Sequence, residues 1–90
     1  MMKGIISVIG KDNIGIIAEV CGFLSKNEIN ILEISQHILD GYFNMTMVVD
    51  ISNVDDKFSQ VIEGIEQVAK NIGVEIKLQR ADIFDSMHRI

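Results

Sequence analysis

The sequence predicts an α+β domain in which one antiparallel sheet is covered on one face by two helices. Three observations support this prediction. Hydrophobic residues alternate between strand-like and helix-like spacing, a tight-turn dipeptide separates two apolar runs near the middle, and the segments follow the order strand, helix, strand, strand, helix, strand. An order of this kind suits a sheet of four strands whose helices lie on a single face.

The first segment is a run of β-branched residues typical of a strand, and a glycine-containing loop follows it. This loop contains Gly10, Asp12, Asn13 and Gly15, and the helix after it begins near Ile14. The first amide N–H groups of that helix and the positive end of its dipole therefore face the loop. A small anion such as a carboxylate is favoured there, which makes the loop the candidate ligand site.

Two other interpretations of the loop follow from its residues. Gly10 and Gly15 are spaced like the glycines of a phosphate-binding P-loop, but two isoleucines stand where that motif requires Lys and Ser or Thr. Nucleotide hydrolysis is therefore disfavoured. In the second interpretation Asp12 or Asn13 only caps the helix, and Gly15 only permits close packing. The residues alone do not separate this capping role from ligand binding.

The first helix, predicted over residues 14–27, has a wider apolar surface than one contact with a sheet requires. One stripe comprises Ile14, Ile17, Ala18, Cys21 and Leu24, and a second comprises Ile16, Val20 and Phe23. We expect one stripe to face the sheet and the other to meet a second helix or another subunit. Because a two-layer monomer would leave the second stripe exposed, we favour a homodimer interface formed by it. Cys21 is the only cysteine, so we expect it to act as a small core residue.

Residues 30–39 and 42–51 are predicted to form a hairpin, because Asp40-Gly41 supplies the positive φ angles of a two-residue turn. The pairs expected on its apolar face are Ile38 with Phe43, Ile34 with Met47 and Leu32 with Val49. This register also places Gln36 beside Met45 on that face. A buried amide needs hydrogen-bond partners, so Gln36 either anchors backbone groups, which we favour, or reaches toward a ligand.

A second amphipathic helix is predicted over residues 54–71, with Asn53 as its N-cap and Gly73 at its end. Residues 74–80 then alternate between apolar and polar side chains, as in a half-buried strand. The complete order matches the ferredoxin-like βαββαβ arrangement.

We expect a single domain over residues 1–80, followed by a short helical tail over residues 81–90. The apolar residues of the tail, which would share one helical side, are Ile83, Phe84, Met87 and Ile90. This spacing predicts that the tail docks on the domain or on its partner.

Composition and charge disfavour several other functions. The net charge of −5 and the scattered basic residues argue against nucleic-acid binding. No apolar run is long enough to cross a membrane and the N-terminus lacks a signal-peptide pattern, so we expect a cytoplasmic protein. His37 and His88 belong to no ligand motif, and we expect neither a metal nor a cofactor. No nucleophile is paired with a base, so we expect no catalytic residue and no enzyme.

Two short motifs resemble those of the ACT domain family of small-molecule regulatory modules. Asp12-Asn13-Ile14-Gly15 is similar to the family's Asp-x-Pro-Gly turn, with Ile14 in place of Pro, and Glu28-Ile29-Asn30-Ile31 is similar to its stretch ending in Asn-Ile. This resemblance covers about residues 3–80. Residues 34–43 and 82–90 also resemble free-standing single-ACT-domain proteins. The chain is similar as well to the ACT portions of the glycine cleavage transcriptional repressor and of formyltetrahydrofolate deformylase.

The resemblance implies that an amino acid or similar metabolite binds at a subunit interface and exerts allosteric control. The matching positions for this site are Gly10, Asp12, Asn13, Ile14 and Gly15, with Asn30 and Ile31 contributed by the neighbouring chain. We therefore expect a homodimeric regulatory module whose output passes to a separate effector protein. The alternative is a ligand-free interaction subunit that docks a separate enzyme or regulator.

Overall fold

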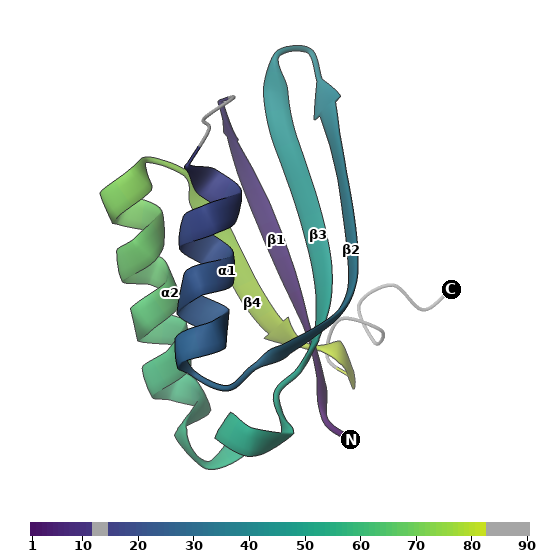
Figure 1. Cartoon of the computed structure of the whole chain (residues 1–90), viewed down its shortest axis with the longest axis vertical. Helices are drawn as coiled ribbons and strands as arrows, with labels where there is room; N and C mark the ends of the chain where they lie inside the picture. Colours follow the sequence, from purple (N-terminus) through teal and green to yellow (C-terminus); the bar gives the residue numbers. More distant parts are fainter. Residues whose placement is uncertain (12–14, 83–90) are drawn as a thin grey trace.

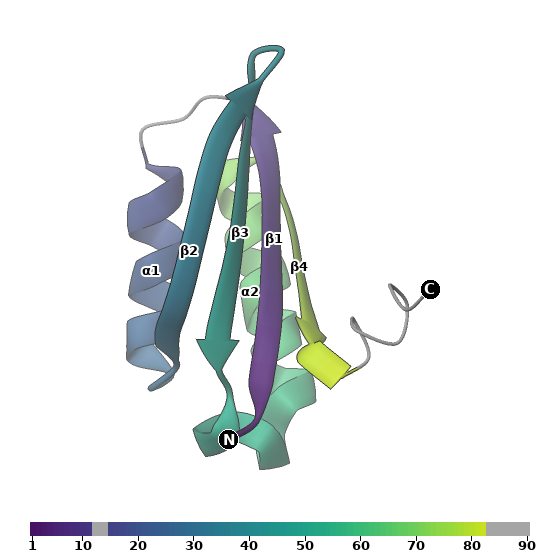
Figure 2. The ribbon, with the colours of Figure 1, turned by 90° about the vertical axis from the view of Figure 1, so that its right-hand side faces the viewer.

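The computed structural model describes residues 1–11 and 15–82. The elements in order are β1 (Lys3–Lys11), α1 (Ile16–Lys26), β2 (Asn30–Leu39), β3 (Tyr42–Asp50), a 3-10 helix η1 (Ser52–Lys57), α2 (Phe58–Ile72) and β4 (Glu75–Arg80). The strands form one antiparallel sheet in the order β2-β3-β1-β4, and both α-helices lie on the same face (Figures 1 and 2). The predicted ferredoxin-like fold is confirmed. The predicted helical tail lies outside the described residues from position 83 onward.

The core lies between the helices and the middle strands of the sheet. Alternate residues of β1 and β3 point into it, as the period of two in a strand requires. The residues that these two strands bury most completely are Ile6, Val8, Met45, Met47 and Val49. The helices close the core with rows spaced three or four residues apart, which comprise Ile16, Val20 and Leu24 in α1 and Val61, Ile65 and Ala69 in α2.

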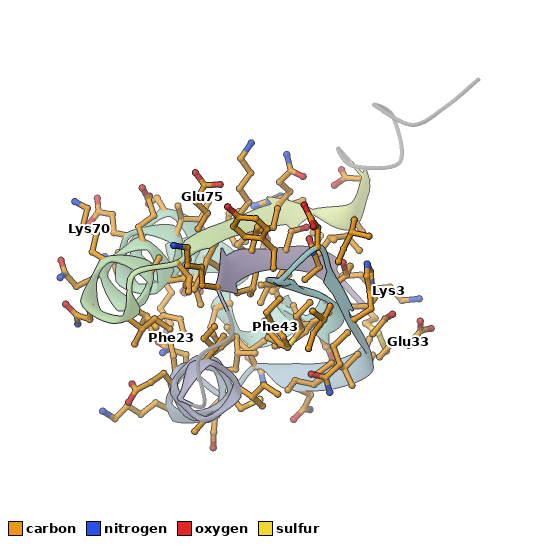
Figure 3. All side chains as sticks on the ribbon, turned by 90° about the horizontal axis from the view of Figure 1, so that it is seen from above. Lys3, Phe23, Glu33, Phe43, Lys70 and Glu75 are labelled. Carbon is orange, nitrogen blue, oxygen red and sulfur yellow. The ribbon has the colours of Figure 1, made fainter. Side chains whose placement is uncertain are left out.

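The predicted faces of α1 are wrong in part: Leu24 is buried as expected, but the stripe proposed for a homodimer interface is covered within the chain. Ile16 and Val20, expected to remain exposed in a monomer, are only 1% and 0% exposed, whereas Ile17 is an exposed residue. Phe23 is half-buried between the two helices (Figure 3), and its ring covers Gly64 of α2. The reason is that α1 packs against both the sheet and α2, so the neighbouring rows that contain Ile16 and Phe23 are both used inside the chain.

The hairpin register is confirmed near the turn and wrong at its far end. Asp40 and Gly41 have φ angles of 53° and 82°, as a two-residue turn of this type requires. Ile38 pairs with Phe43 and Ile34 with Met47, as predicted. The register then shifts between Ile31 and Glu33, so Val49 pairs with Ile31 rather than with Leu32. A bulge inserts one residue into one strand, and counting back from the turn does not detect it.

Two further expectations need correction. Asn53 was predicted to cap a continuous helix, but it lies within η1, and α2 begins only at Phe58. Gln36 does lie beside Met45, but it is exposed rather than buried, as is every residue of the edge strand β2. The predicted helix end at Gly73 is confirmed: this residue has a φ of 70°, and the N–H of Val74 donates to the carbonyl oxygen of Ala69 at 3.0 Å.

Candidate functional site

The candidate loop joins the end of β1 to the start of α1 (Figure 1). The structure describes Gly10 and Gly15 at its ends, whereas positions 12–14 of the predicted site lie outside the described residues. Gly15 immediately precedes α1, and its carbonyl oxygen accepts the backbone N–H of Glu19 at 3.0 Å. The N-terminal end of α1 is therefore directed at the loop, where its dipole favours an anion.

Gly10 has a packing function that the sequence did not reveal. A Cβ atom at this position would lie 2.5 Å from Cγ1 of Val74, in the connection between α2 and β4. The absence of a side chain therefore lets this connection pack directly against the end of β1. Gly10 fixes the local shape of the site, whatever contact its backbone makes with a ligand.

Asn30 and Ile31 lie far from the loop within one chain. Lys11 pairs with Tyr42, and Tyr42 pairs with Leu39, so the loop lies at the end of the sheet where β2 finishes. Asn30 is at the start of β2, and about 3.3 Å per residue places it roughly 30 Å from that end. The structure therefore places Gly10 and Gly15 at the two ends of the same loop and separates this loop from Asn30 and Ile31.

Among the described residues, most of the exposed large hydrophobic side chains belong to β2, whereas sequence reasoning expected an exposed apolar surface on α1. All residues of β2 are exposed, and the large hydrophobic ones are Ile31, Leu32, Ile34, Ile38 and Leu39. β2 also forms one edge of the sheet, so its outer side has no neighbouring strand in the part of the chain that the structure describes (Figure 2). The signal that could have revealed it is topological, because this order of elements places the second strand at an edge.

Among the described residues, a carboxyl group with altered acidity lies at the other end of the sheet. Asp50 accepts hydrogen bonds from the Ser52 hydroxyl at 2.6 Å and from the Ser52 backbone N–H at 3.0 Å, and these bonds lower the pKa of its carboxyl group. They fix the turn from β3 into η1 and have no contact with the candidate loop.

Within the described residues, no group of three or more acidic, His or Cys side chains could hold a metal ion. None of the described helices is long and apolar enough to span a membrane.

Comparison with known proteins identifies the family. A family model described as an ACT domain matches residues 4–79. A UPF0237 protein from Bifidobacterium longum is 51% identical over 90 residues, which cover 100% of both chains. An ACT domain protein from Streptococcus pneumoniae has a TM-score of 0.83 at 41% identity, covering 92% of this chain and 93% of that chain.

More distant structures have the same fold. The regulatory subunit of aspartate kinase from Thermus thermophilus has a TM-score of 0.66 at 28% identity, covering 86% of this chain and 50% of that chain. A putative glycine cleavage system transcriptional repressor shares the fold with a TM-score of 0.72 at 18% identity, covering 88% of this chain and 45% of that chain. A formyltetrahydrofolate deformylase from Pseudomonas syringae shares it with a TM-score of 0.79 at 21% identity, covering 89% of this chain and 28% of that chain. Because the family model spans most of the chain and close relatives match its whole length, the chain belongs to the ACT domain family.

Proposed function

We propose that this protein is a cytoplasmic regulatory module that works as a homodimer and binds an amino acid where two subunits meet. ACT domains are in general regulatory modules that bind small molecules, and one related structure is the regulatory subunit of a kinase. The observation that carries the proposal for this chain is the exposed edge formed by β2. It offers a second copy both unpaired backbone groups and apolar side chains.

The backbone geometry restricts how two such edges can pair. Leu39 and Tyr42 flank the two-residue turn and form its closing pair, so the backbone groups of alternate residues point toward β3. The intervening residues of β2, namely Ile34, Gln36 and Ile38, direct their N–H and C=O groups away from β3, toward the open edge of the sheet. An antiparallel dimer must pair these residues with one another. We favour the register centred on Gln36, because it sets Ile34 against Ile38 of the second copy and lets the two Gln36 amides bond to each other.

This pairing also accounts for the separation of the predicted site residues. The second β2 runs in the opposite direction, so its Asn30 and Ile31 come to the end of the sheet where the β1–α1 loop of the first chain lies. Each interface then contains two equivalent sites, and each site takes residues from both chains. Separation within one chain is therefore an expected property of a site completed by dimerisation.

The chemistry of the loop suits a zwitterion. Amide groups at the start of α1 would receive the carboxylate, and Asp12 would accept the ammonium group of the same ligand. The proposed ligand-binding residues remain Gly10, Asp12, Asn13, Ile14 and Gly15 from one chain and Asn30 and Ile31 from the other. Ile16, Val20 and Phe23 are no longer proposed as interface residues, because the chain itself covers them.

A charged residue on the β2 edge tests the proposal. Ile34→Lys should convert the dimer into a monomer, because a lysine on an edge opposes strand pairing, and it should also abolish the thermal shift caused by an amino-acid ligand. Light scattering would measure the mass, and a thermal-shift screen of the amino acids would measure binding. Thr46→Lys, on the exposed face of the neighbouring strand, is the matched control and should leave both properties unchanged.

A monomeric wild-type protein at micromolar concentration would contradict the dimer. An amino acid that stabilises Ile34→Lys as strongly as wild type would contradict the shared site. If wild type is monomeric and no amino acid shifts its melting temperature, the exposed β2 edge instead favours the ligand-free interaction subunit.

A further inference from the structure

A hollow of about 470 Å³ lies on the other side of β1 from α1, where the end of this strand meets the start of β4. Figure 3 looks onto this end of the molecule and labels Glu75, the first residue of β4. The hollow is formed entirely within one chain, away from the β2 edge. Its volume falls within the usual range for small-molecule sites.

The floor of the hollow is apolar and partly exposed. Ile72 contributes from the end of α2, Val74 from the connection between α2 and β4, and Ile9 from β1. Ile9 is 45% exposed, and Tyr42, which stands at the rim, is 48% exposed. The close approach of Val74 to Gly10 holds this floor in place. An apolar ligand body would therefore find a preformed surface here.

Two opposite charges flank this floor without neutralising each other. Lys11 ends β1 and Glu75 begins β4, and both line the hollow. In residues 1–11 and 15–82, no ion pair or side-chain hydrogen bond engages either of them. Both side chains are exposed, so each is available to a ligand.

The end of α2 adds to the negative side. Ile72 and Gly73 lie at the C-terminal end of this helix and line the hollow. The helix dipole is negative at that end, and its last carbonyl groups lack intrahelical donors. An ammonium group is therefore favoured beside Glu75, whereas a carboxylate is favoured beside Lys11.

The spacing of the charges selects the shape of the ligand. Glu75 of β4 pairs with Ile9 of β1, and Lys11 is two residues further along β1. Lys11 and Glu75 are therefore diagonal neighbours on adjacent strands, with Cα atoms about 7–8 Å apart. We propose that this hollow is a second small-molecule site, which binds an elongated zwitterion with its carboxylate at Lys11, its ammonium group at Glu75 and its aliphatic body on the floor. This site goes beyond the proposed interface site, because it needs only one chain and a ligand whose charges lie far apart.

Three probes of equal chain length test this inference: 6-aminohexanoate, which carries both charges, and hexanoate and hexylamine, which each carry one. Titration into isotope-labelled protein should shift the amide signals of residues 9–11 and 72–75. Each charge contact at an exposed position is worth up to about 1 kcal/mol, so the zwitterion should bind about two- to fivefold more tightly than either analogue.

Charge-removing variants assign the two ends of the probe. Lys11→Met should reduce the affinity for 6-aminohexanoate to that for hexylamine, and Glu75→Gln should reduce it to that for hexanoate. Lys3→Met, at the opposite end of β1, is the control and should change neither. Binding should also persist in the monomeric variant Ile34→Lys, which separates this site from the proposed interface site.

Equal affinities for the three probes, or signal shifts confined to other residues, would overturn the inference. Loss of binding in Ile34→Lys would place the probe at the subunit interface instead. The failure of the interface proposal alone would leave these measurements unaffected, since they require only one folded chain.

Discussion

β2 and β3 are adjacent strands with similar apolar content, but they differ completely in burial. Met47 on β3 is 0% exposed, whereas Ile34, its direct partner on β2, is 46% exposed. Both side chains lie on the face of the sheet that the helices cover. The difference arises because β3 lies inside the sheet, between β1 and β2, whereas β2 is an edge strand whose residues are all exposed. Position in the sheet, rather than hydrophobicity, therefore separates a buried residue from an exposed one.

The largest expected effect comes from truncating the buried member of this pair. Met47→Ala should lower the free energy of unfolding by about 2–5 kcal/mol, because it leaves a cavity in a closely packed core. Ile34→Ala should cost less than about 1 kcal/mol in dilute protein, where no second copy covers it. Urea denaturation at low and high protein concentration would measure both. Equal losses for the two variants in dilute protein would show that β2 is packed as tightly as β3.

The close packing of α1 against α2 gives the next effect. A Cβ atom at Gly64 would lie 2.7 Å from the ring of Phe23, so Gly64→Ala should destabilise the protein by about 1–3 kcal/mol. Gly22 has nothing within 4 Å of such an atom and lies inside α1, so Gly22→Ala should stabilise by about 0.5–1 kcal/mol. Thermal unfolding of both variants would check the opposite signs. Stabilisation by both would mean that Phe23 yields at little cost.

The turn that leads into the exposed strand stores a smaller amount of strain. Glu28 has a φ of 58°, a left-handed conformation that costs a residue with a side chain roughly 1 kcal/mol or more. Glu28→Gly should relieve this strain and raise the stability by up to about 1 kcal/mol after the entropy of glycine is counted. Glu19→Gly, at an exposed position in α1, should instead lower it by about 1 kcal/mol. Chemical denaturation would measure the free energy of unfolding of both variants. If Glu28→Gly lost as much stability as Glu19→Gly, Glu28 would not be strained.

The smallest effect concerns acid stability where β3 ends beside the start of β2. The pKa of Asp50 is lowered in the folded protein, so its hydrogen bonds to Ser52 stabilise the fold fully above its ordinary value of 3.8. This contribution is lost as the pH falls through the lowered pKa. In Asp50→Asn the corresponding part of the acid dependence should be absent. Between pH 2 and pH 5, the free energy of unfolding of Asp50→Asn, measured from unfolding curves, should therefore decline less steeply than that of wild type. Identical declines in the two proteins would contradict the lowered pKa.

The sequence predicted the order of the elements, the turn at Asp40-Gly41 and the stop at Gly73, because these depend on local spacing and on backbone conformations that few residues adopt. It did not predict the bulge in β2 between Ile31 and Glu33, because the point at which the strand register shifts depends on contacts across the sheet. It also placed Ile16 and Val20 on the interface side of α1, although both are buried in the core. Two apolar rows on one helix look equivalent until the neighbouring helix is in place.

The candidate site was predictable only in part. The loop and its helix start follow from glycine positions and hydrophobic spacing, and the packing of Gly10 against Val74 needed the structure. The separation of Asn30 from the loop follows from strand direction, but it becomes meaningful only when the exposed edge is known. The hollow between Lys11 and Glu75 joins segments more than sixty residues apart in the chain, so no local motif predicts it.

Amide hydrogen exchange along β2 tests the central claim most directly. If two copies pair through this edge, the outward amides of Ile34, Gln36 and Ile38 should be protected at high protein concentration and should lose protection on dilution. The inward amides of Ser35 and His37 bond to β3 and should be protected at both concentrations, which makes them the internal control. If the three outward amides exchange freely at high concentration while the inward ones remain protected, β2 is a free edge, and the homodimeric site is wrong.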